Sequence, residues 1–223
     1  MSRTFTTTVA CPGCGASLDL EGYESVNADR QPELREQILE GTLQVYSCAC
    51  GESFRGAPEL SYMDLGRKQW IAVHSLSALE RYREAEDHAQ EVFDTSLGKL
   101  APPTAQELGQ GIRPRVVFGW GALREKLVAR DADVEDDALE LLKLQVFKSQ
   151  GIMPGPGQAL RLVEADAEHL RLALVDETQE HAETGVQVPR AAYDEVAASP
   201  DQWAQLREPL IAGCWVDCLK LLL

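Results

Sequence analysis

Two short stretches of the sequence hold two cysteines each, Cys11-Pro12-Gly13-Cys14-Gly15 and Cys48-Ala49-Cys50-Gly51. Each pair follows a segment with the pattern of a β-strand and precedes a glycine, whose backbone can bend tightly enough to turn two thiolates toward one ion. A structural Zn²⁺ site takes four such ligands in a tetrahedron. The two stretches therefore predict one structural zinc site whose ligands are Cys11, Cys14, Cys48 and Cys50.

The second cysteine pair is one residue shorter than the first, which leaves its geometry open. Only Ala49 separates Cys48 from Cys50, and Ser47 stands where the first cysteine of a longer pair would be. The alternative interpretation is a set of reduced thiols packed in the core. Glycine, proline and polar neighbours make both stretches poor core segments, so the metal site is the preferred interpretation.

The remaining cysteines, Cys214 and Cys218, lie among apolar residues near the C-terminus. Their spacing would place the thiols about 13 Å apart in a strand, too far to share an ion, and about 6 Å apart in a helix. The apolar neighbours favour buried structural thiols over a second metal or redox site. The first residues lack the apolar core of a signal peptide, so we expect a cytoplasmic protein with reduced cysteines.

The composition excludes several classes of partner. The chain has 223 residues, with 36 Asp and Glu against 21 Lys and Arg, for a formal net charge of −15. Nucleic-acid binding normally depends on clustered Lys and Arg, so we expect no nucleic-acid partner. An anionic membrane surface is disfavoured for the same reason. No apolar run reaches the roughly 18 residues of a membrane span, so no membrane insertion is expected.

The first hundred residues combine strand patterns with two helix patterns. Pro32 in the first turn and Gly41 just past the end predict a short helix between them. Ser77 and Glu80 have the spacing of a capping box, which predicts the start of an acidic helix that ends near Ser96. Alternating or β-prone residues predict strands over residues 6–9, 16–23, 43–46, 59–63 and 69–73.

The rest of the chain mixes helices with a hairpin. Residues 98–103 contain two prolines and predict a linker. Beyond it, we expect helices over 122–129 and 133–149, a β-hairpin from 160–162 and 170–174, a strand near 186–188 and a late helix from Ser199. The predicted fold class is α+β. An antiparallel β module with short helices occupies residues 1–98, and an α+β module with the hairpin occupies residues 104–223.

The segment from about residue 5 to about residue 100 resembles the CpXC domain family, a bacterial and archaeal family defined by two close cysteine pairs. The cysteine stretches carry the resemblance, together with Leu60-Ser61-Tyr62-Met63-Asp64. The resemblance implies a zinc ribbon-like fold for the N-terminal module. It carries over no catalytic residue.

Other polar features have ordinary structural explanations. Gly119-Trp120-Gly121 lacks the spacing of a phosphate-binding loop, so we expect a tight turn with Trp120 packed. The histidines are His74, His88, His169 and His181. None is at ligand spacing from a cysteine or from another histidine, and only His74 follows a strand of the zinc module. The acids Glu80, Glu84, Glu86, Asp87 and Glu91 are expected to form a solvated helix face, with a docking face for a basic partner as the alternative.

The C-terminal stretch from Trp215 to Leu223 is unusually apolar for a chain end. Alternation of Trp215, Leu219 and Leu221 favours a half-buried strand that closes the chain's own core. A surface offered to a partner is the alternative.

We predict a non-catalytic zinc-binding adaptor or regulatory protein that acts by protein–protein interaction. Four thiolates would fill every position of the metal and leave none for water, and familiar catalytic motifs are missing. The first alternative is a metal-dependent or redox enzyme, which requires an open zinc site or a reactive thiol. The second is a nucleic-acid-binding zinc ribbon, which the charge opposes.

Overall fold

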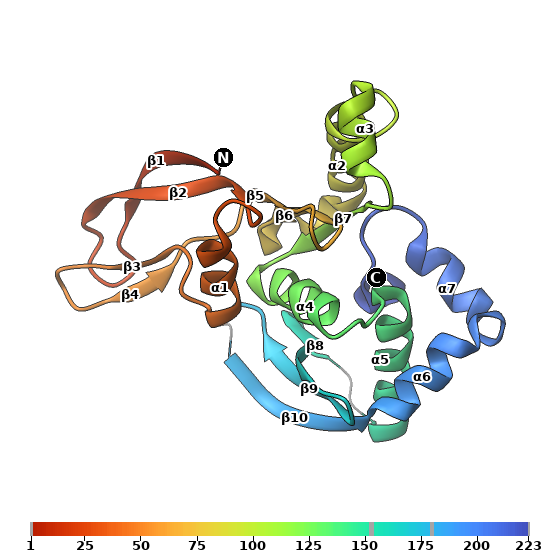
Figure 1. Cartoon of the computed structure of the whole chain (residues 1–223). Coiled ribbons are helices and arrows are strands. Elements are labelled where there is room, and N and C mark those ends of the chain that lie inside the picture. The colour runs from red at the N-terminus through yellow and green to blue at the C-terminus, as the bar shows by residue number, and fades with distance from the viewer. Residues whose placement is uncertain (1, 152–153, 179–180, 223) are drawn as a thin grey trace.

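The computed structural model describes residues 2–151, 154–178 and 181–222. Its strands are β1 (Arg3–Ala10), β2 (Ser17–Asn27), β3 (Val45–Ser47), β4 (Ser53–Arg55), β5 (Leu60–Asp64), β6 (Gln69–His74), β7 (Arg113–Phe118), β8 (Gln158–Ala165), β9 (His169–Asp176) and β10 (His181–Pro189). Within the described residues they form three sheets, with the orders β1-β2-β5-β6-β7, β3-β4 and β10-β9-β8 (Figure 1).

The helices lie mainly between and around these sheets. The α-helices are α1 (Pro32–Glu40), α2 (Tyr82–Ser96), α3 (Pro103–Gly109), α4 (Trp120–Asp131), α5 (Asp136–Gln150), α6 (Arg190–Ala198) and α7 (Ala204–Ile211). In the described part of the chain, the 3-10 helices are η1 (Leu76–Arg81), η2 (Pro200–Trp203) and η3 (Cys218–Leu221). The expected α+β class is confirmed, with a strand-rich N-terminal region and a C-terminal region that contains the β8–β9 hairpin.

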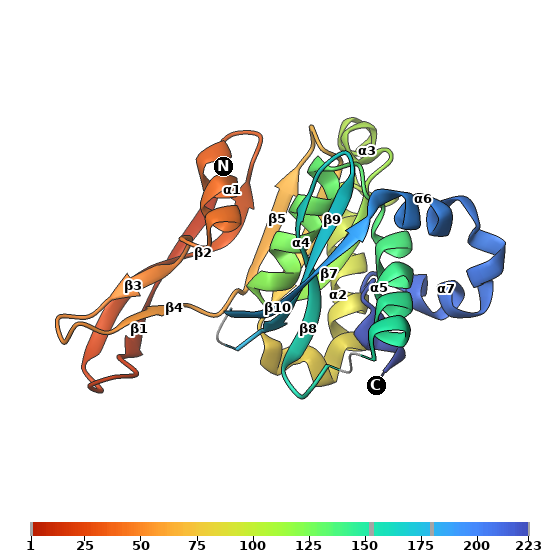
Figure 2. The ribbon, with the colours of Figure 1, turned by 90° about the horizontal axis from the view of Figure 1, so that it is seen from below.

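Part of the largest sheet leaves the body of the molecule. Pairing between β2 and β5 is parallel and involves only Ser25–Asn27 with Ser61–Met63. β1 and the rest of β2 therefore extend past the other strands. Together with the β3–β4 hairpin they form a projection, here called the arm (Figures 1 and 2). The Tyr46 hydroxyl donates to the Glu21 carbonyl oxygen at 2.7 Å and joins the hairpin to β2.

The body is layered around α4. On one side, α4 and α1 pack against the largest sheet through an apolar cluster that includes Leu34, Ile38, Tyr62, Leu123 and Leu127. On the other side, α4 contacts β8 of the C-terminal sheet. The outer face of the largest sheet is covered by α2, whose Phe93 ring meets Trp70 edge-on with ring centroids 5.6 Å apart.

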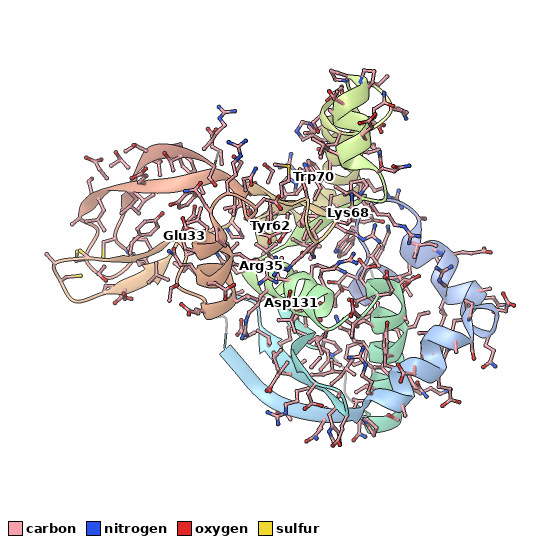
Figure 3. All side chains as sticks on the ribbon, viewed as in Figure 1. Glu33, Arg35, Tyr62, Lys68, Trp70 and Asp131 are labelled. Carbon is pink, nitrogen blue, oxygen red and sulfur yellow. The ribbon has the colours of Figure 1, made fainter. Side chains whose placement is uncertain are left out.

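Ion pairs join α1 to the end of α4. The Arg35 guanidinium lies 2.6 Å from the Asp131 carboxylate, and Arg67 contacts the same carboxylate at 3.1 Å. Figure 3 shows Arg35, Tyr62 and Asp131 close together at this junction. The Arg35 side chain is buried, so its charge requires these carboxylate partners.

A buried charge network fixes the C-terminal sheet to α4 and α5. The Glu125 carboxylate of α4 lies 2.7 Å from the Lys143 ammonium and 3.1 Å from the Arg161 guanidinium. Arg161 also contacts Asp217 at 2.6 Å, and Lys143 contacts Glu140 at 2.8 Å. All five side chains are almost completely buried. The network thus connects α4, α5, β8 and the C-terminal segment inside the protein.

The C-terminal segment packs on its own chain, as the sequence favoured, but not as a strand. Trp215 and Val216 are buried in an extended stretch that ends in η3. The Cys214 carbonyl oxygen accepts a hydrogen bond from the Val116 N–H of β7 at 3.0 Å. Glu86 of α2 accepts from the Trp215 N–H at 2.7 Å. The expectation that Glu86 is solvated is therefore wrong, because it binds this segment.

Local sequence signals located the elements but misplaced two helix starts. The helix predicted between Pro32 and Gly41 and the β8–β9 hairpin are confirmed. The capping-box prediction is wrong: η1 occupies this stretch without a side-chain cap, and Ser77 instead contacts the Ser75 hydroxyl at 2.7 Å. The helix expected from Asp133 starts at Asp136, because Asp133 has a φ of 51°, which is outside the helical region.

The largest sheet includes strands from both sides of the expected linker. β7 follows residues 98–103 in the chain, and it pairs in parallel with β6, which precedes them. Leu100 is 67% exposed, in the connection between α2 and α3. The division into modules 1–98 and 104–223 stays a prediction. If the chain is cut between the two modules, they must still be held together by the pairing of β6 with β7.

Replacing Lys143 by Met should destabilise the fold strongly. The change removes the cation that two buried carboxylates share, and an unpaired buried charge costs roughly 3–5 kcal/mol. We expect the free energy of unfolding in urea to fall by this amount. Lys148→Met is the matched control, because Lys148 is exposed on the same helix and should change stability by less than about 0.5 kcal/mol. Equal stability of the two variants would contradict a structural role for the network.

Limited proteolysis tests the boundary. We expect trypsin to cut first after the exposed Lys99, and the two fragments to elute together in gel filtration because β7 remains paired with β6. A first cut within residues 116–149 would show that the boundary is misplaced.

Candidate metal centre

The predicted ligands lie together at the far end of the arm. Cys11 and Cys14 belong to the loop between β1 and β2, and Cys48 and Cys50 belong to the turn between β3 and β4. The Sγ atoms of Cys11 and Cys50 are 3.7 Å apart, as are those of Cys14 and Cys48. All four sulfur atoms lie within 4.8 Å of one another.

These distances suit a metal tetrahedron. A tetrahedron of sulfur atoms placed about 2.3 Å from a central Zn²⁺ has edges of about 3.8 Å. A disulfide requires about 2.05 Å between its sulfur atoms, and all four cysteines are free. Each 3.7 Å contact joins one loop to the other. A metal ion at the centre would therefore hold the two hairpins of the arm together.

Both loops present their sulfur atoms through the same backbone arrangement. The Gly15 N–H donates to the Cys11 carbonyl oxygen at 2.8 Å, and the Gly51 N–H donates to the Cys48 carbonyl oxygen at 2.9 Å. Both glycines have a positive φ, 73° and 93°, which other residues rarely adopt. The second loop is one residue shorter, yet its turn still brings Cys50 to the cluster. The single-residue spacing is thus compatible with ligation.

Ser47 lies outside the cluster. It is the last residue of β3 and pairs with Ser53 of β4, and the two hydroxyl oxygens are 3.1 Å apart. Its place in the ladder explains why the cysteine pair starts one residue later: the strand continues through Ser47, and the turn begins at Cys48.

The electrostatics of the cluster favour a bound cation. Burial raises the pKa of the Cys11 thiol, but hydrogen bonds from backbone N–H groups, led by that of Cys14, outweigh this and bring it to about 7. At Cys50 the Glu52 N–H lowers the pKa, but neighbouring thiols, led by Cys48, raise it to about 12. Four thiolates repel one another at these distances, and a divalent ion at the centre would stabilise all of them.

The other cysteines are buried, as the sequence predicted. Cys214 contacts the Gln90 side chain at 3.5 Å, and burial raises the pKa of its thiol. The Cys218 Sγ lies within 4.8 Å of carboxylate oxygens of Glu140 and Asp217. Those carboxylates already pair with the cations of the buried network, and burial raises the pKa of Cys218 well above its usual value. Cys218 is therefore a core thiol.

Sequence reasoning missed Glu140 and Asp217 as members of this buried group. A signal was present: Glu140 lies between Leu139 and Leu141 on a helix whose residues 138–143 are all buried. A carboxylate in such a position needs a partner inside the protein. One partner, Lys143, lies three residues further along the same helix, whereas the other, the Cys218 N–H, is far away in the chain and could not be deduced.

His74 and Trp120 do not belong to the cysteine cluster. His74 pairs with Glu59 at 3.3 Å and is not among the potential metal ligands of the described residues. Trp120 is buried at the start of α4, and its indole N–H donates to the Gly56 carbonyl oxygen at 2.8 Å. The expected tight turn with Trp120 packed is confirmed, with a φ of 86° at Gly119.

Comparison with known proteins identifies the family. Residues 9–143 match the family model described as CpXC protein. The chain belongs to the CpXC family. This assignment agrees with the resemblance seen in the sequence, and the match continues through α4 into α5, past the N-terminal module. A search of the curated proteins and a search of the solved structures each found no match.

Among the described residues, no helix has both the length and the apolar character that crossing a bilayer requires.

Proposed function

We propose that Cys11, Cys14, Cys48 and Cys50 bind one structural Zn²⁺, and that the protein is a non-catalytic adaptor whose arm binds a protein partner. The observation that carries the metal assignment is the convergence of four sulfur atoms from two separate hairpins. A tetrahedral set of four thiolates suits zinc or an iron–sulfur centre, and the knuckle-like loops favour zinc.

A structural role for the ion is favoured over a catalytic one. A catalytic zinc ion usually has three protein ligands and keeps the fourth position for water or substrate. Here four thiols are within reach of one centre, so no position is left for water. The enzyme alternative would require one of the four cysteines to stay unbound.

The adaptor role is supported by the exposed edge of the arm. β1 is the edge strand of the largest sheet, and residues 4–10 carry no charged side chain. Natural proteins usually protect such edges with charges, prolines or bulges, because an open edge can pair with a strand of another protein. The partner that fits is therefore an extended protein segment that adds to β1.

The register shows which backbone groups of β1 are available. The N–H of Tyr23 donates to the Gln44 side chain, and the carbonyl oxygen of Glu21 accepts from the Tyr46 hydroxyl. Both of these backbone groups therefore point away from β1. Opposite them in the antiparallel register are Thr4 and Thr6. In such a ladder, partners alternate between bonded and non-bonded pairs. The backbone groups of Thr6 therefore point to the outer edge.

Reduced thiolates suit the cytoplasm of a bacterial cell. The net charge of −15 argues against a nucleic acid as the partner, because a polyanion would be repelled.

Purified protein should contain about one equivalent of zinc per chain by elemental analysis. The double variant Cys11→Ser, Cys14→Ser should lose the metal, and the arm should become sensitive to protease, because metal binding supplies folding energy in small modules. Cys214→Ser is the matched control and should keep its zinc. Retention of one equivalent in the double variant would rule out this ligand set.

Thr6→Pro tests the partner-binding edge. Proline lacks the N–H that a partner strand needs, and it is tolerated where the N–H faces solvent. We expect partners captured from the native cell with wild-type protein to be lost with Thr6→Pro, as measured by quantitative mass spectrometry. Thr6→Val keeps the N–H and should capture the same proteins as wild type. Partner capture that Thr6→Pro leaves unchanged would contradict binding along β1.

A further inference from the structure

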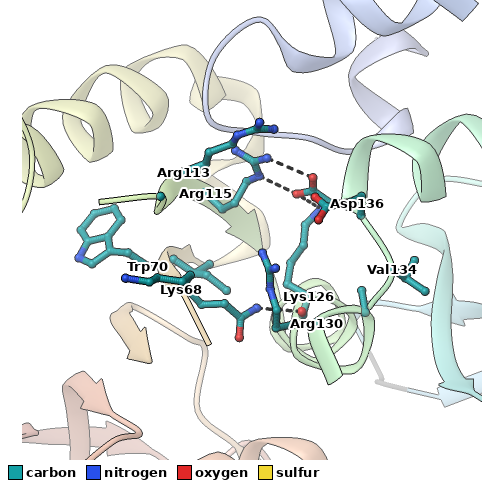
Figure 4. Close-up of a pocket in the computed structure, with 13 residues that line it drawn as sticks. Lys68, Trp70, Arg113, Arg115, Lys126, Arg130, Val134 and Asp136 are labelled. Carbon is teal, nitrogen blue, oxygen red and sulfur yellow. Dashed lines mark hydrogen bonds and ion pairs between the residues drawn. The ribbon is translucent and has the colours of Figure 1, made fainter. Parts of the chain in front are cut away.

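A basic pocket lies on the body of the molecule, away from the metal centre. It has a volume of about 180 Å³ and opens where β6 and β7 begin, beside the end of α4 and the connection to α5 (Figure 4). Its floor is formed by Gln69 and Ile71 of β6 and by Arg113 and Arg115 of β7, which are paired in register. The side chains of alternate residues share one face of a sheet, and here that face is covered by α4.

The pocket concentrates positive charge in an acidic protein. Its basic lining residues are Lys68, Arg113, Arg115, Lys126 and Arg130, against the acids Glu135 and Asp136. The formal charge of the lining is thus positive, although the chain as a whole carries −15. Like charges gathered around one cavity repel one another, so this arrangement is favourable when an anion occupies the cavity.

Two of these cations already share one carboxylate partner. Arg115 forms a bidentate contact with Asp136, with distances of 2.6 and 3.1 Å. Lys126 lies 3.2 Å from the same carboxylate and donates to the Val216 carbonyl oxygen at 2.7 Å. The attraction of both cations lowers the pKa of Asp136 despite its burial, so this carboxylate stays ionised. Arg115, Lys126 and Asp136 form the fixed inner wall.

Three cations remain available at the mouth. Among the described residues, no ion pair or side-chain hydrogen bond is made by Lys68, Arg113 or Arg130. All three are exposed, and they come from three segments: the turn before β6, the start of β7 and the last turn of α4. Figure 4 shows them around the same cavity. They can therefore converge on one anionic group.

A buried acceptor also lines the pocket. Gln69 is only 6% exposed, and its Nε2 donates to the Lys126 carbonyl oxygen at 2.9 Å. This bond fixes the amide orientation and leaves Oε1 without a hydrogen-bond partner. A buried unpaired acceptor is costly, so the position calls for a donor from outside the protein. A ligand hydroxyl or amino group can provide it.

We propose that this pocket binds a small phosphate monoester that carries a hydroxyl group. The phosphate group presents several acceptor oxygens and up to two negative charges, which match Lys68, Arg113 and Arg130. The hydroxyl group of the ester donates to Gln69 Oε1. Trp70 also lines the pocket, and its ring packs against Phe93 with centroids 5.6 Å apart.

A nucleic-acid chain fits the pocket less well than a small molecule. The cavity of about 180 Å³ accepts one phosphate group with a short substituent. The phosphates that would follow along a strand would meet the acidic surface of a chain with a net charge of −15. The site is also independent of the metal centre and of the edge of β1, so its test does not depend on either.

Calorimetry with the 223-residue protein tests the proposal, with glycerol 3-phosphate as the probe. We expect one molecule to bind per chain at low ionic strength, and the affinity to fall as salt screens the cations. Glycerol, which lacks the phosphate, should not bind. The double variant Lys68→Gln, Arg130→Gln should bind at least about tenfold more weakly. The loss of a single charge-assisted hydrogen bond already lowers an affinity by about tenfold.

Arg124→Gln is the matched control, because Arg124 is exposed on the same helix as Arg130 but does not line this pocket. It should bind the probe as wild type does. No binding by the wild type, or equal weakening by Arg124→Gln and the double variant, would overturn the site. Tighter binding of inorganic phosphate than of the ester would overturn the choice of an ester, and binding of malate in place of both would overturn the phosphate class.

Discussion

The position of the C-terminal sheet depends on one buried carboxylate, that of Glu125. It accepts from the Lys143 ammonium, from the Arg161 guanidinium and from the Leu162 N–H at 2.6 Å. These partners come from α5 and β8, while Glu125 itself lies on the helix that also covers the largest sheet. Removing any one partner leaves a charge inside the protein, so the elements are coupled. The two sheets and the C-terminal segment therefore have a defined relative position.

The arm rests on a different constraint. β1 is exposed for almost its whole length, and the β3–β4 hairpin has three residues in each strand. Such a projection buries too little apolar surface to be stable by packing alone. Cys11 and Cys48 are the buried side chains at its far end. A metal ion there would replace the missing core, which explains why the cysteines occur at the two loops rather than within the body.

The sequence was most informative where one short segment determines the structure. The cysteine loops, the helix starting at Pro32 and the β8–β9 hairpin follow from residues that are close in the chain. The sequence could not show that β7 pairs with β6 or that Glu125 meets Arg161, because these contacts join distant segments. The capping-box prediction failed for a local reason. Ser77 contacts Ser75, and a 3-10 turn precedes α2 where the spacing alone indicated a regular helix.

Net charge also proved to be a property of the whole chain and not of each surface. Several acids that contribute to the value of −15 are buried, among them Glu125, Glu140 and Asp217, and they neutralise cations inside the protein. They therefore contribute little to the field outside. Asp136 likewise pairs with Arg115 and Lys126 at the inner wall of the pocket. A locally basic cavity can consequently exist in an acidic protein. The net charge of the chain disfavours a long polyanion, but it does not prevent one small anion from binding in this cavity.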